Sequence, residues 1–276
     1  MTGKFLCVGS EQALPPYPHV VFYLDDDRRL VFADMRQFGR MRLLAMKKFP
    51  TLPQIAALAG RFRVIRYDSR GHGHSTVTPG PYTIEQVASD ALGLLDKLAV
   101  PRAHFCGLSM GGMVGMWLGI HAPQRIDRLV LANTAAKIGT AEMWNARIDA
   151  VRKGGMPSIA SAVLARWFSS QLLEAPTPII ARMRTTLEGV STEGYTASCA
   201  AVRDMDQRHL VSRIRAPTLV IAGTEDFATP AEDGRFVAEH VPNAHYVELP
   251  AAHLSNVQAA SAFTQALMQF LTGRME

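Results

Sequence analysis

Short apolar segments alternate with longer amphipathic segments from Arg61 to the end of the chain. The apolar segments have the length and composition of β-strands and lie at 61–67, 103–109, 128–135, 217–223 and 245–249. Helices are expected between and after them, over 83–98, 110–122, 231–240 and 255–271. Parallel strands need a crossover connection, and a crossover helix covers one face of the sheet. The alternation therefore predicts an α/β fold with a mostly parallel sheet and helices on both faces.

The helix expected over 83–98 carries the clearest local signals. Thr83 and Gln86 have the spacing of a capping box, in which each side chain bonds to the backbone of the other residue. The residues predicted to form its buried stripe recur at helical spacing: Ile84, Val87, Ala88, Ala91, Leu94, Leu95 and Leu98.

One internal segment interrupts the alternation. Residues 137–213 are rich in Ala, Arg and Met and contain no convincing strand, so we expect several helices there. This segment would form a helical cap over the sheet edge. The α/β core would then consist of 51–136 and 214–276.

The first fifty residues differ from the rest of the chain. Within 1–50, two β-rich runs flank residues 25–28 and predict a hairpin, and 40–46 is a candidate third strand. The chain carries a net charge of +5, and 1–66 hold 11 Lys and Arg residues against 5 Asp and Glu residues. A solvated basic face is the simpler interpretation of this excess, and a nucleic-acid contact is the alternative.

The sequence GLSMG at 107–111 lies between an expected strand and an expected helix. This strand–turn–helix context is the one that a nucleophile elbow requires, and it makes Ser109 the candidate nucleophile. The glycines are expected to allow a tight turn free of Cβ clashes. The backbone N–H of Met110, at the start of the helix, is a candidate oxyanion donor.

A serine hydroxyl needs a base to become a nucleophile, and in this fold the acid and the base follow the serine in the chain. The segment 223–230, which contains Asp226, directly follows an expected strand, and His253 lies on the loop after the last strand. Parallel strands end at the same edge of a sheet, so both side chains are expected near Ser109. His253 would accept the serine proton, and Asp226 would fix its tautomer.

The sequence predicts neither a metal nor a cofactor. His72 and His74 lie in a Gly-rich turn at 66–75, but no carboxylate or cysteine cluster completes a metal site there, and a tight turn is the better interpretation.

The expected compartment is the cytoplasm. The cysteines are few and scattered, which favours reduced thiols: Cys7, Cys106 and Cys199. No apolar run reaches the length of a membrane span, and the start of the chain has no signal-peptide pattern.

Residues 53–271 resemble the 3-oxoadipate enol-lactonases, α/β hydrolases of the β-ketoadipate pathway of aromatic catabolism. The resemblance rests on FRVIRYDSRGHGHS, PYTIEQ, AHFCGLSMGGMVG, LVLANTAAKIGTAEMW, PTLVIAGTEDFATP and HYVELPAAHLSN. It implies hydrolysis of an enol-lactone that carries a carboxylate, with the family's catalytic residues falling on Ser109, Asp226 and His253. The family's cap tryptophan falls on Trp144. Arg147 is a candidate for binding the substrate carboxylate.

Residues 8–44 do not match that family. They resemble an internal piece of a formamidopyrimidine-DNA glycosylase, through DMRQFGRMRL, but the catalytic parts of a glycosylase are missing. The chain therefore resembles a chimera with its junction near 48–53. The lactonase loop that supplies a second oxyanion N–H is absent, and counting without gaps places Leu44 at its position. Because losing one oxyanion donor costs about 10²–10³-fold in turnover, weak or absent activity is expected.

Two alternative functions stay open. The chain could be another Ser-His-Asp hydrolase, such as a carboxylesterase or a cofactor-free haloperoxidase. From a different class, it could be a DNA-binding or repair-derived protein that acts through 8–44. The expected partner is a small lactone, with neither a membrane nor nucleic acid involved, and the sequence does not predict an oligomeric state.

Overall fold

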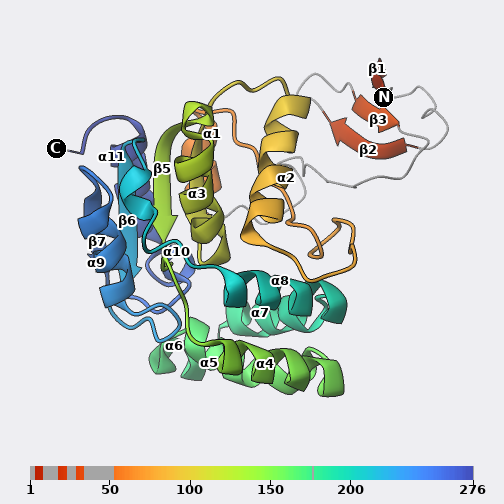
Figure 1. Cartoon of the computed structure of the whole chain (residues 1–276), viewed down its shortest axis with the longest axis vertical. Coiled ribbons are helices and arrows are strands. Elements are labelled where there is room, and N and C mark those ends of the chain that lie inside the picture. The colour runs from red at the N-terminus through yellow and green to blue at the C-terminus, as the bar shows by residue number, and fades with distance from the viewer. Residues whose placement is uncertain (1–3, 9–17, 24–28, 34–52, 176, 276) are drawn as a thin grey trace. The chain divides into compact units, whose positions relative to one another are not determined.

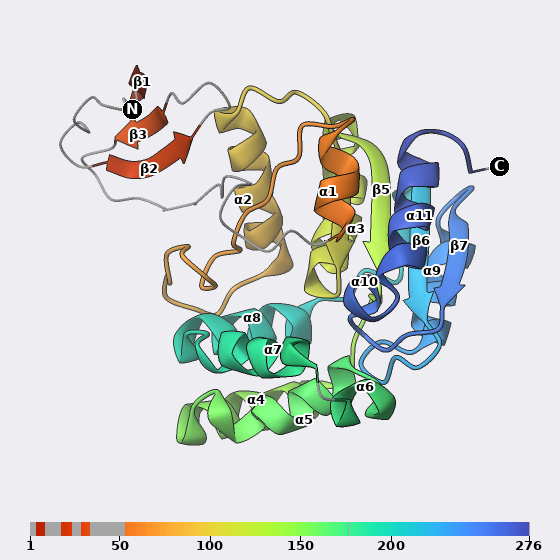
Figure 2. The ribbon, with the colours of Figure 1, turned by 180° about the vertical axis from the view of Figure 1, so that it is seen from behind.

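The computed structural model describes residues 4–8, 18–23, 29–33, 53–175 and 177–275. The chain divides into two compact units, Met1–Thr78 and Pro79–Glu276 (Figures 1 and 2). No helix among the described residues is long and apolar enough to cross a membrane.

The first unit contains a three-stranded antiparallel sheet of order β1-β3-β2. Its strands are β1 (Lys4–Val8), β2 (Pro18–Tyr23) and β3 (Arg29–Ala33), followed by the helix α1 (Pro53–Ala59). The predicted hairpin is confirmed, since β2 pairs with β3 up to Tyr23 and Arg29. The third strand is β1, which was not expected from the sequence. The candidate strand at 40–46 lies outside the described residues.

The strand predicted over 61–67 is wrong. Among the described residues, only Tyr67 in this segment forms a bridge, and the rest is irregular. Apolar composition alone does not make a strand, because a strand persists only where a neighbour completes its ladder of hydrogen bonds. The chain then makes the predicted turn, in which the Asp68 carboxylate accepts a hydrogen bond from the His74 N–H at 2.9 Å.

The second unit is built on a parallel sheet of order β4-β5-β6-β7. Its strands are β4 (Ala103–Leu108), β5 (Ile126–Ala132), β6 (Thr218–Gly223) and β7 (His245–Leu249). These elements confirm the four strands predicted after residue 100.

Helices cover both faces of this sheet, as predicted. On one face lie α3 (Met110–His121), whose Gly115 approaches Leu129 and Leu131, and α9 (Ala231–His240), whose Gly234 approaches Val220. The register pairs Leu131 with Val220, so these residues point to the same face. The opposite face is covered by α11 (Ala260–Leu271), where the ring of Phe270 lies under the Arg128 guanidinium (Figure 2).

The helix α2 (Ile84–Lys97) forms where its cap predicts. The Thr83 hydroxyl accepts a hydrogen bond from the Gln86 N–H at 3.1 Å, and the Gln86 side chain accepts one from the Thr83 N–H at 3.0 Å. The predicted stripe is buried apart from Leu98, which is half-buried at the C-cap. Burial of this stripe stabilises the helix far more than its propensity does.

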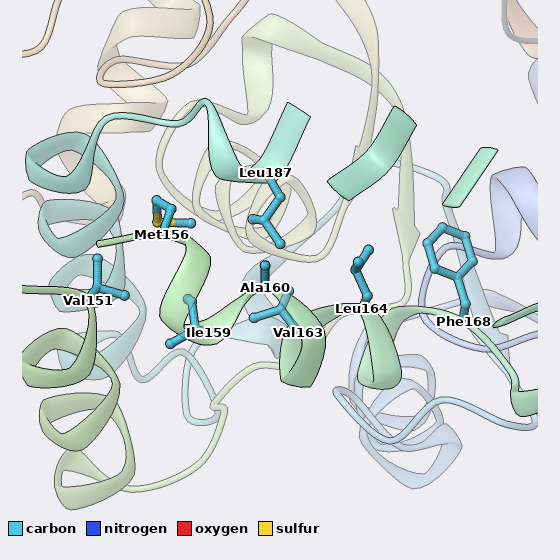
Figure 3. Packing of buried hydrophobic residues seen from close by; sticks show 8 residues of the cluster. All are labelled: Val151, Met156, Ile159, Ala160, Val163, Leu164, Phe168 and Leu187. Carbon is cyan, nitrogen blue, oxygen red and sulfur yellow. The ribbon is translucent and has the colours of Figure 1, made fainter. Parts of the chain in front are cut away.

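Residues 137–213 contain helices, as predicted. They are α4 (Ala141–Gly154), α5 (Pro157–Trp167), α6 (Ser170–Glu174), α7 (Pro178–Glu188) and α8 (Thr192–Asp204). Figure 3 shows the apolar core that α4, α5 and α7 share, which is formed by Val151, Met156, Ile159, Ala160, Val163, Leu164, Phe168 and Leu187. A buried side chain of this size contributes about 1.5–3 kcal/mol, so these helices hold together through their own apolar core.

The helix predicted over 255–271 is divided in two. The short helix α10 (Ser255–Gln258) ends before Ala259, whose φ of −112° and ψ of 45° are not helical, and α11 starts at Ala260. The break lies beside Gln258, whose side-chain oxygen accepts a hydrogen bond from the Ala252 N–H at 3.3 Å. This contact holds α10 against the loop that precedes it.

Candidate active site

Ser109 lies at the sharp turn between β4 and α3. Its φ of 57° and ψ of −120° are rare for a residue with a side chain and cost about 1–3 kcal/mol. The turn is held by its backbone, since the Ser109 N–H donates to the Ala132 carbonyl at 2.9 Å. The Thr134 hydroxyl donates to the Ser109 carbonyl at 2.8 Å. The strand–turn–helix expected around GLSMG is confirmed.

The two glycines of this motif have different roles. A Cβ on Gly107 would lie 2.0 Å from the Gly111 carbonyl oxygen, so only glycine fits where β4 and α3 approach each other. A Cβ on Gly111 would meet nothing within 4 Å. The expectation that both glycines prevent clashes is therefore wrong for Gly111. Gly112, just outside the motif, is the crowded one, because a Cβ there would lie 2.6 Å from side-chain atoms of Thr134.

The start of α3 presents a backbone donor. The N–H groups of Gly112 and Met113 both donate to the Ser109 carbonyl, at 2.8 and 3.1 Å. Met110 is the first residue of the helix, so its N–H has no acceptor within the helix. Such an N–H at the positive end of a helix suits an oxyanion. Leu44, the second predicted donor, lies outside the described residues.

Asp226 follows β6 and is almost completely buried. One carboxylate oxygen, Oδ1, accepts hydrogen bonds from the N–H groups of Ala228 and Thr229 at 2.8 and 2.9 Å. The other, Oδ2, accepts from the Thr229 hydroxyl at 2.8 Å and from Asn133 Nδ2 at 2.9 Å. Glu225, the neighbouring carboxylate, is exposed.

These contacts keep the Asp226 carboxylate ionised. Burial alone would raise its pKa, but the hydrogen bond and the attraction to His253 oppose this, as do the bonds from Thr229 and Asn133. The balance lowers the pKa of Asp226 below its usual value.

His253 lies in the loop after β7 and is 3% exposed. Its Nδ1 is 2.9 Å from Asp226 Oδ2 and 3.3 Å from the Thr229 hydroxyl. A carboxylate can only accept, so Nδ1 carries the proton and Nε2 is left as the basic nitrogen in the neutral ring. The acid and base predicted from the sequence therefore form a buried, hydrogen-bonded pair.

The three predicted residues lie at the same edge of the sheet. Ser109 follows β4, Asp226 follows β6 and His253 follows β7, and all of these strands run parallel. Within the described part of the chain, the Ser109 hydroxyl and His253 are not joined by a hydrogen bond, whereas His253 and Asp226 are. Catalytic hydrogen bonds of this kind are often long until a substrate is bound.

Two residues that contact the Asp226 carboxylate, Asn133 and Thr229, were not predicted from the sequence. Thr229 could have been found, since a threonine three residues after an aspartate in a turn is well placed to bond back to it. Asn133 lies far from Asp226 in the sequence, directly after β5. The feature that could have indicated its role is its position at the carboxyl end of β5, the strand that pairs with β6.

The helical segment is joined to the loops that hold the acid and the base. Arg166, on α5, donates to the Phe227 carbonyl at 2.9 Å. The Leu254 N–H donates to the Trp167 carbonyl at 3.1 Å, and Leu254 also packs against the core of the helical segment. The residues that follow Asp226 and His253 thus contact the end of α5.

Trp144 and Arg147 both lie on α4. Trp144 is buried, and its indole N–H donates to the Ile138 carbonyl at 2.9 Å. The Arg147 guanidinium lies over the Trp144 ring, 4.9 Å from the ring centroid. Burial, and next the neighbouring Cys199, raise the pKa of Tyr195 on α8 to about 12, while Arg147 opposes this rise. Arg147 therefore lies close to Tyr195 as well as to Trp144.

Comparison with known proteins identifies a family. A family model described as the alpha/beta hydrolase fold matches residues 45–173. Two curated proteins of Acinetobacter baylyi are similar to the chain. 3-Oxoadipate enol-lactonase 2 is 44% identical over 78% of this chain and 80% of its own length, and 3-oxoadipate enol-lactonase 1 is 37% identical over 79% and 82%.

Solved structures agree with this identification. The enol-lactonase from Burkholderia xenovorans LB400 superposes with a TM-score of 0.80 at 39% identity, covering 91% of this chain and 99% of that one. A thermophilic esterase from Thermogutta terrifontis gives a TM-score of 0.76 at 29% identity, covering 81% and 84%. The predicted fold class is therefore confirmed.

Proposed function

Because the chain belongs to the α/β hydrolase family and is a hydrolase, as its enol-lactonase relatives are, we propose that it hydrolyses the enol-lactone of 3-oxoadipate. The proposed triad consists of Ser109, His253 and Asp226. The observation that carries the proposal is the buried Asp226–His253 pair, at the same sheet edge as the strained turn that holds Ser109.

The reaction proceeds in two acyl-transfer steps. His253 Nε2 takes the proton of the Ser109 hydroxyl as the oxygen attacks the lactone carbonyl carbon. The bond between that carbon and the ring oxygen then breaks, the proton passes to the ring oxygen, and an acyl-enzyme forms on Ser109. The freed enol rearranges to the ketone.

Water completes the cycle. His253 accepts a proton from water, the resulting hydroxide attacks the acyl carbon, and the Ser109 oxygen leaves with the proton. The Met110 N–H donates to the oxyanion in both steps. No metal or cofactor takes part in this scheme.

Arg147 and Trp144 supply the substrate specificity in this proposal. A lactone that carries a carboxylate needs a cation, and the Trp144 ring holds the Arg147 guanidinium in place. Arg147→Met should raise KM for the carboxylate-bearing lactone about tenfold or more, because a hydrogen bond to a charged group is worth about 1.5–3 kcal/mol. Arg152→Met, an exposed position on the same helix, is the matched control, and an equal effect of both variants would contradict this role.

The whole proposal is tested by measuring turnover of the enol-lactone, which is monitored through the fall in the absorbance of this substrate. Ser109→Ala should abolish the enzymatic rate, a fall of up to about 10⁶-fold. The control Ser212→Ala, an exposed serine, should keep the full rate. Lactone turnover that survives Ser109→Ala would overturn the proposal.

An esterase is the second candidate function, and the similarity to the Thermogutta esterase favours it. The same preparation should be assayed with aryl esters of short acids. A kcat/KM for these esters above that for the enol-lactone would favour the esterase.

We expect lactonase turnover to be low, because the loop that carries the family's second oxyanion donor is missing from the sequence of 1–50, although Leu44 falls at the donor's position. A chain in which an enol-lactonase N-terminus replaces 1–50 should be faster by about 10²–10³-fold. Equal rates for both chains would show that the present N-terminus supplies a competent donor.

A further inference from the structure

Asn133 is a buried polar residue that the catalytic scheme does not use. It follows β5 directly, is 1% exposed and has a φ of 44°. Its N–H donates to the Ile221 carbonyl at 2.7 Å, which fixes its backbone to β6. Asparagine is among the few residue types that adopt this left-handed backbone readily.

The Asn133 amide touches the acid and the chain on both sides of the base. Its Nδ2 donates to Asp226 Oδ2 at 2.9 Å and to the Ala252 carbonyl at 3.4 Å. Its Oδ1 accepts a hydrogen bond from the hydroxyl of Ser255, which is fully buried. Ala252 and Ser255 flank His253, so one side chain connects the acid with the loop that carries the base.

The chemistry of the partners fixes which way this amide faces. The Asp226 carboxylate and the Ala252 carbonyl can only accept hydrogen bonds, so both need the NH₂ group of Asn133. The Ser255 hydroxyl can donate, and it meets the remaining oxygen. Each polar atom of the amide is therefore used, and the opposite orientation would place two acceptors against each other.

The atom that Asn133 contacts is also the atom that binds His253. Asp226 Oδ2 receives Asn133 Nδ2 and lies 2.9 Å from His253 Nδ1. A carboxylate that rotated about its bond to Cβ would lose both contacts together. We infer that Asn133 is a positioning residue, which holds Asp226 Oδ2 and the His253 loop in register for proton transfer; this inference rests on the proposed catalytic roles of Asp226 and His253.

Two substitutions separate this role from mere packing. Asn133→Asp keeps the shape and can still accept from Ser255, but it removes the donor and places a second carboxylate beside Asp226. Asn133→Ala removes the whole amide. Both should lower kcat by about 10–10²-fold and leave KM within about twofold, as a 1 Å misplacement near the reaction costs on that order. Gln207→Met is the control, because it removes a buried amide that contacts the Met113 carbonyl and neither Asp226 nor His253.

A double-mutant cycle provides the readout that a purely structural residue would not affect. If Asn133 acts through Asp226, then Asn133→Ala should cost little further activity in an Asp226→Asn background. The inference would be overturned if the activity losses of the two single variants multiply in the double variant, or if Asn133→Ala leaves kcat unchanged. The rate at which a fluorophosphonate labels Ser109 gives the same cycle without depending on the identity of the substrate.

One further measurement keeps this inference separate from the proposed function. The Nδ1 proton of His253 should give a downfield proton NMR signal in the wild-type chain. This signal should shift or broaden in Asn133→Ala, and it should keep its chemical shift and line width in Gln207→Met. A wild-type chain that neither turns over the lactone nor labels at Ser109 refutes the proposed function, whereas a signal unmoved in Asn133→Ala refutes the positioning role.

Discussion

The nucleophile turn and the acid–base pair are held by different means. The turn at Ser109 is fixed by its backbone, through a positive φ, a close approach at Gly107 and main-chain hydrogen bonds. In the pair of Asp226 and His253, the oxygen that bonds to His253 also accepts from the side chains of Thr229 and Asn133, while backbone N–H groups hold only the other oxygen. The turn therefore depends mainly on the absence of a side chain at Gly107, and the contact between Asp226 and His253 depends mainly on the side chains around the shared oxygen.

The largest difference should come from the acid. Asp226→Asn keeps the size of the side chain, but its amide no longer selects the His253 tautomer with the proton on Nδ1. We expect kcat to fall by about 10⁴-fold, as is typical for this change in a Ser-His-Asp triad. Steady-state turnover measures this, and a loss below tenfold would contradict the proposed role of the pair.

The next prediction compares the two glycines of the turn. In Gly107→Ala the new Cβ would overlap the Gly111 carbonyl, so the backbone around Ser109 must shift, with a loss of kcat on the order of 10²-fold. Gly111→Ala is its matched control, because its Cβ enters open space, and it should keep turnover within about threefold. Equal losses in both variants would show that the close approach is not what holds the turn.

A smaller effect is expected at Thr229. Thr229→Val keeps the shape and the backbone N–H that binds Asp226 Oδ1, and it removes the hydroxyl, which bonds to Oδ2 and lies 3.3 Å from His253 Nδ1. Since one hydrogen bond to a charged group is worth about 1.5–3 kcal/mol, kcat should fall by about 10–10²-fold. Thr224→Val, an exposed threonine in the same loop, should leave the rate unchanged.

The smallest effect concerns stability and pH. The pKa of Asp226 is lowered on folding, so the unfolded chain binds a proton at this group at a higher pH than the folded chain does. Its contribution to stability is complete above the unfolded pKa and is lost as the pH falls through the folded one. Denaturant unfolding from pH 7 to pH 3 should show a steeper loss of stability in the wild-type chain than in Asp226→Asn, and parallel curves would argue against this contribution.

Much of the site could be predicted because its residues follow strands. Ser109, Asp226 and His253 each lie in the turn or loop that follows an apolar strand, and parallel strands place such loops at one edge. Asn133 was missed although it also follows a strand, because an asparagine there has a role only once its neighbour in space is known. The local sequence pattern predicts which residues lie at the end of a strand. It does not predict which side chain a buried amide will contact, because that depends on the order of the strands in the sheet.

The errors in the fold have the same origin. The segment 61–67 has the composition of a strand, but whether a strand forms depends on pairing with a neighbouring strand. Composition alone does not reveal whether such a neighbour is present. The division of the last helix at Ala259 lies beside Gln258, whose side chain bonds to a loop several residues earlier, and no local pattern in the sequence contains that contact. Caps such as Thr83 and Gln86 were predicted well, since all of their partners lie within one turn.

The parallel pairing of β5 with β6 has a consequence for how this enzyme can change. The two strands pair from Leu129 and Thr218 to Ala132 and Ile221, and the helices α4 to α8 all occur in the chain between them. The chain leaves β5 at its carboxyl end and enters β6 at the opposite end of the sheet, so any replacement of this insert must still carry the chain back across the sheet to Thr218. We expect changes to the insert to be tolerated best where they spare the end of α5, because Arg166 and Trp167 bond there to the loops after Asp226 and His253.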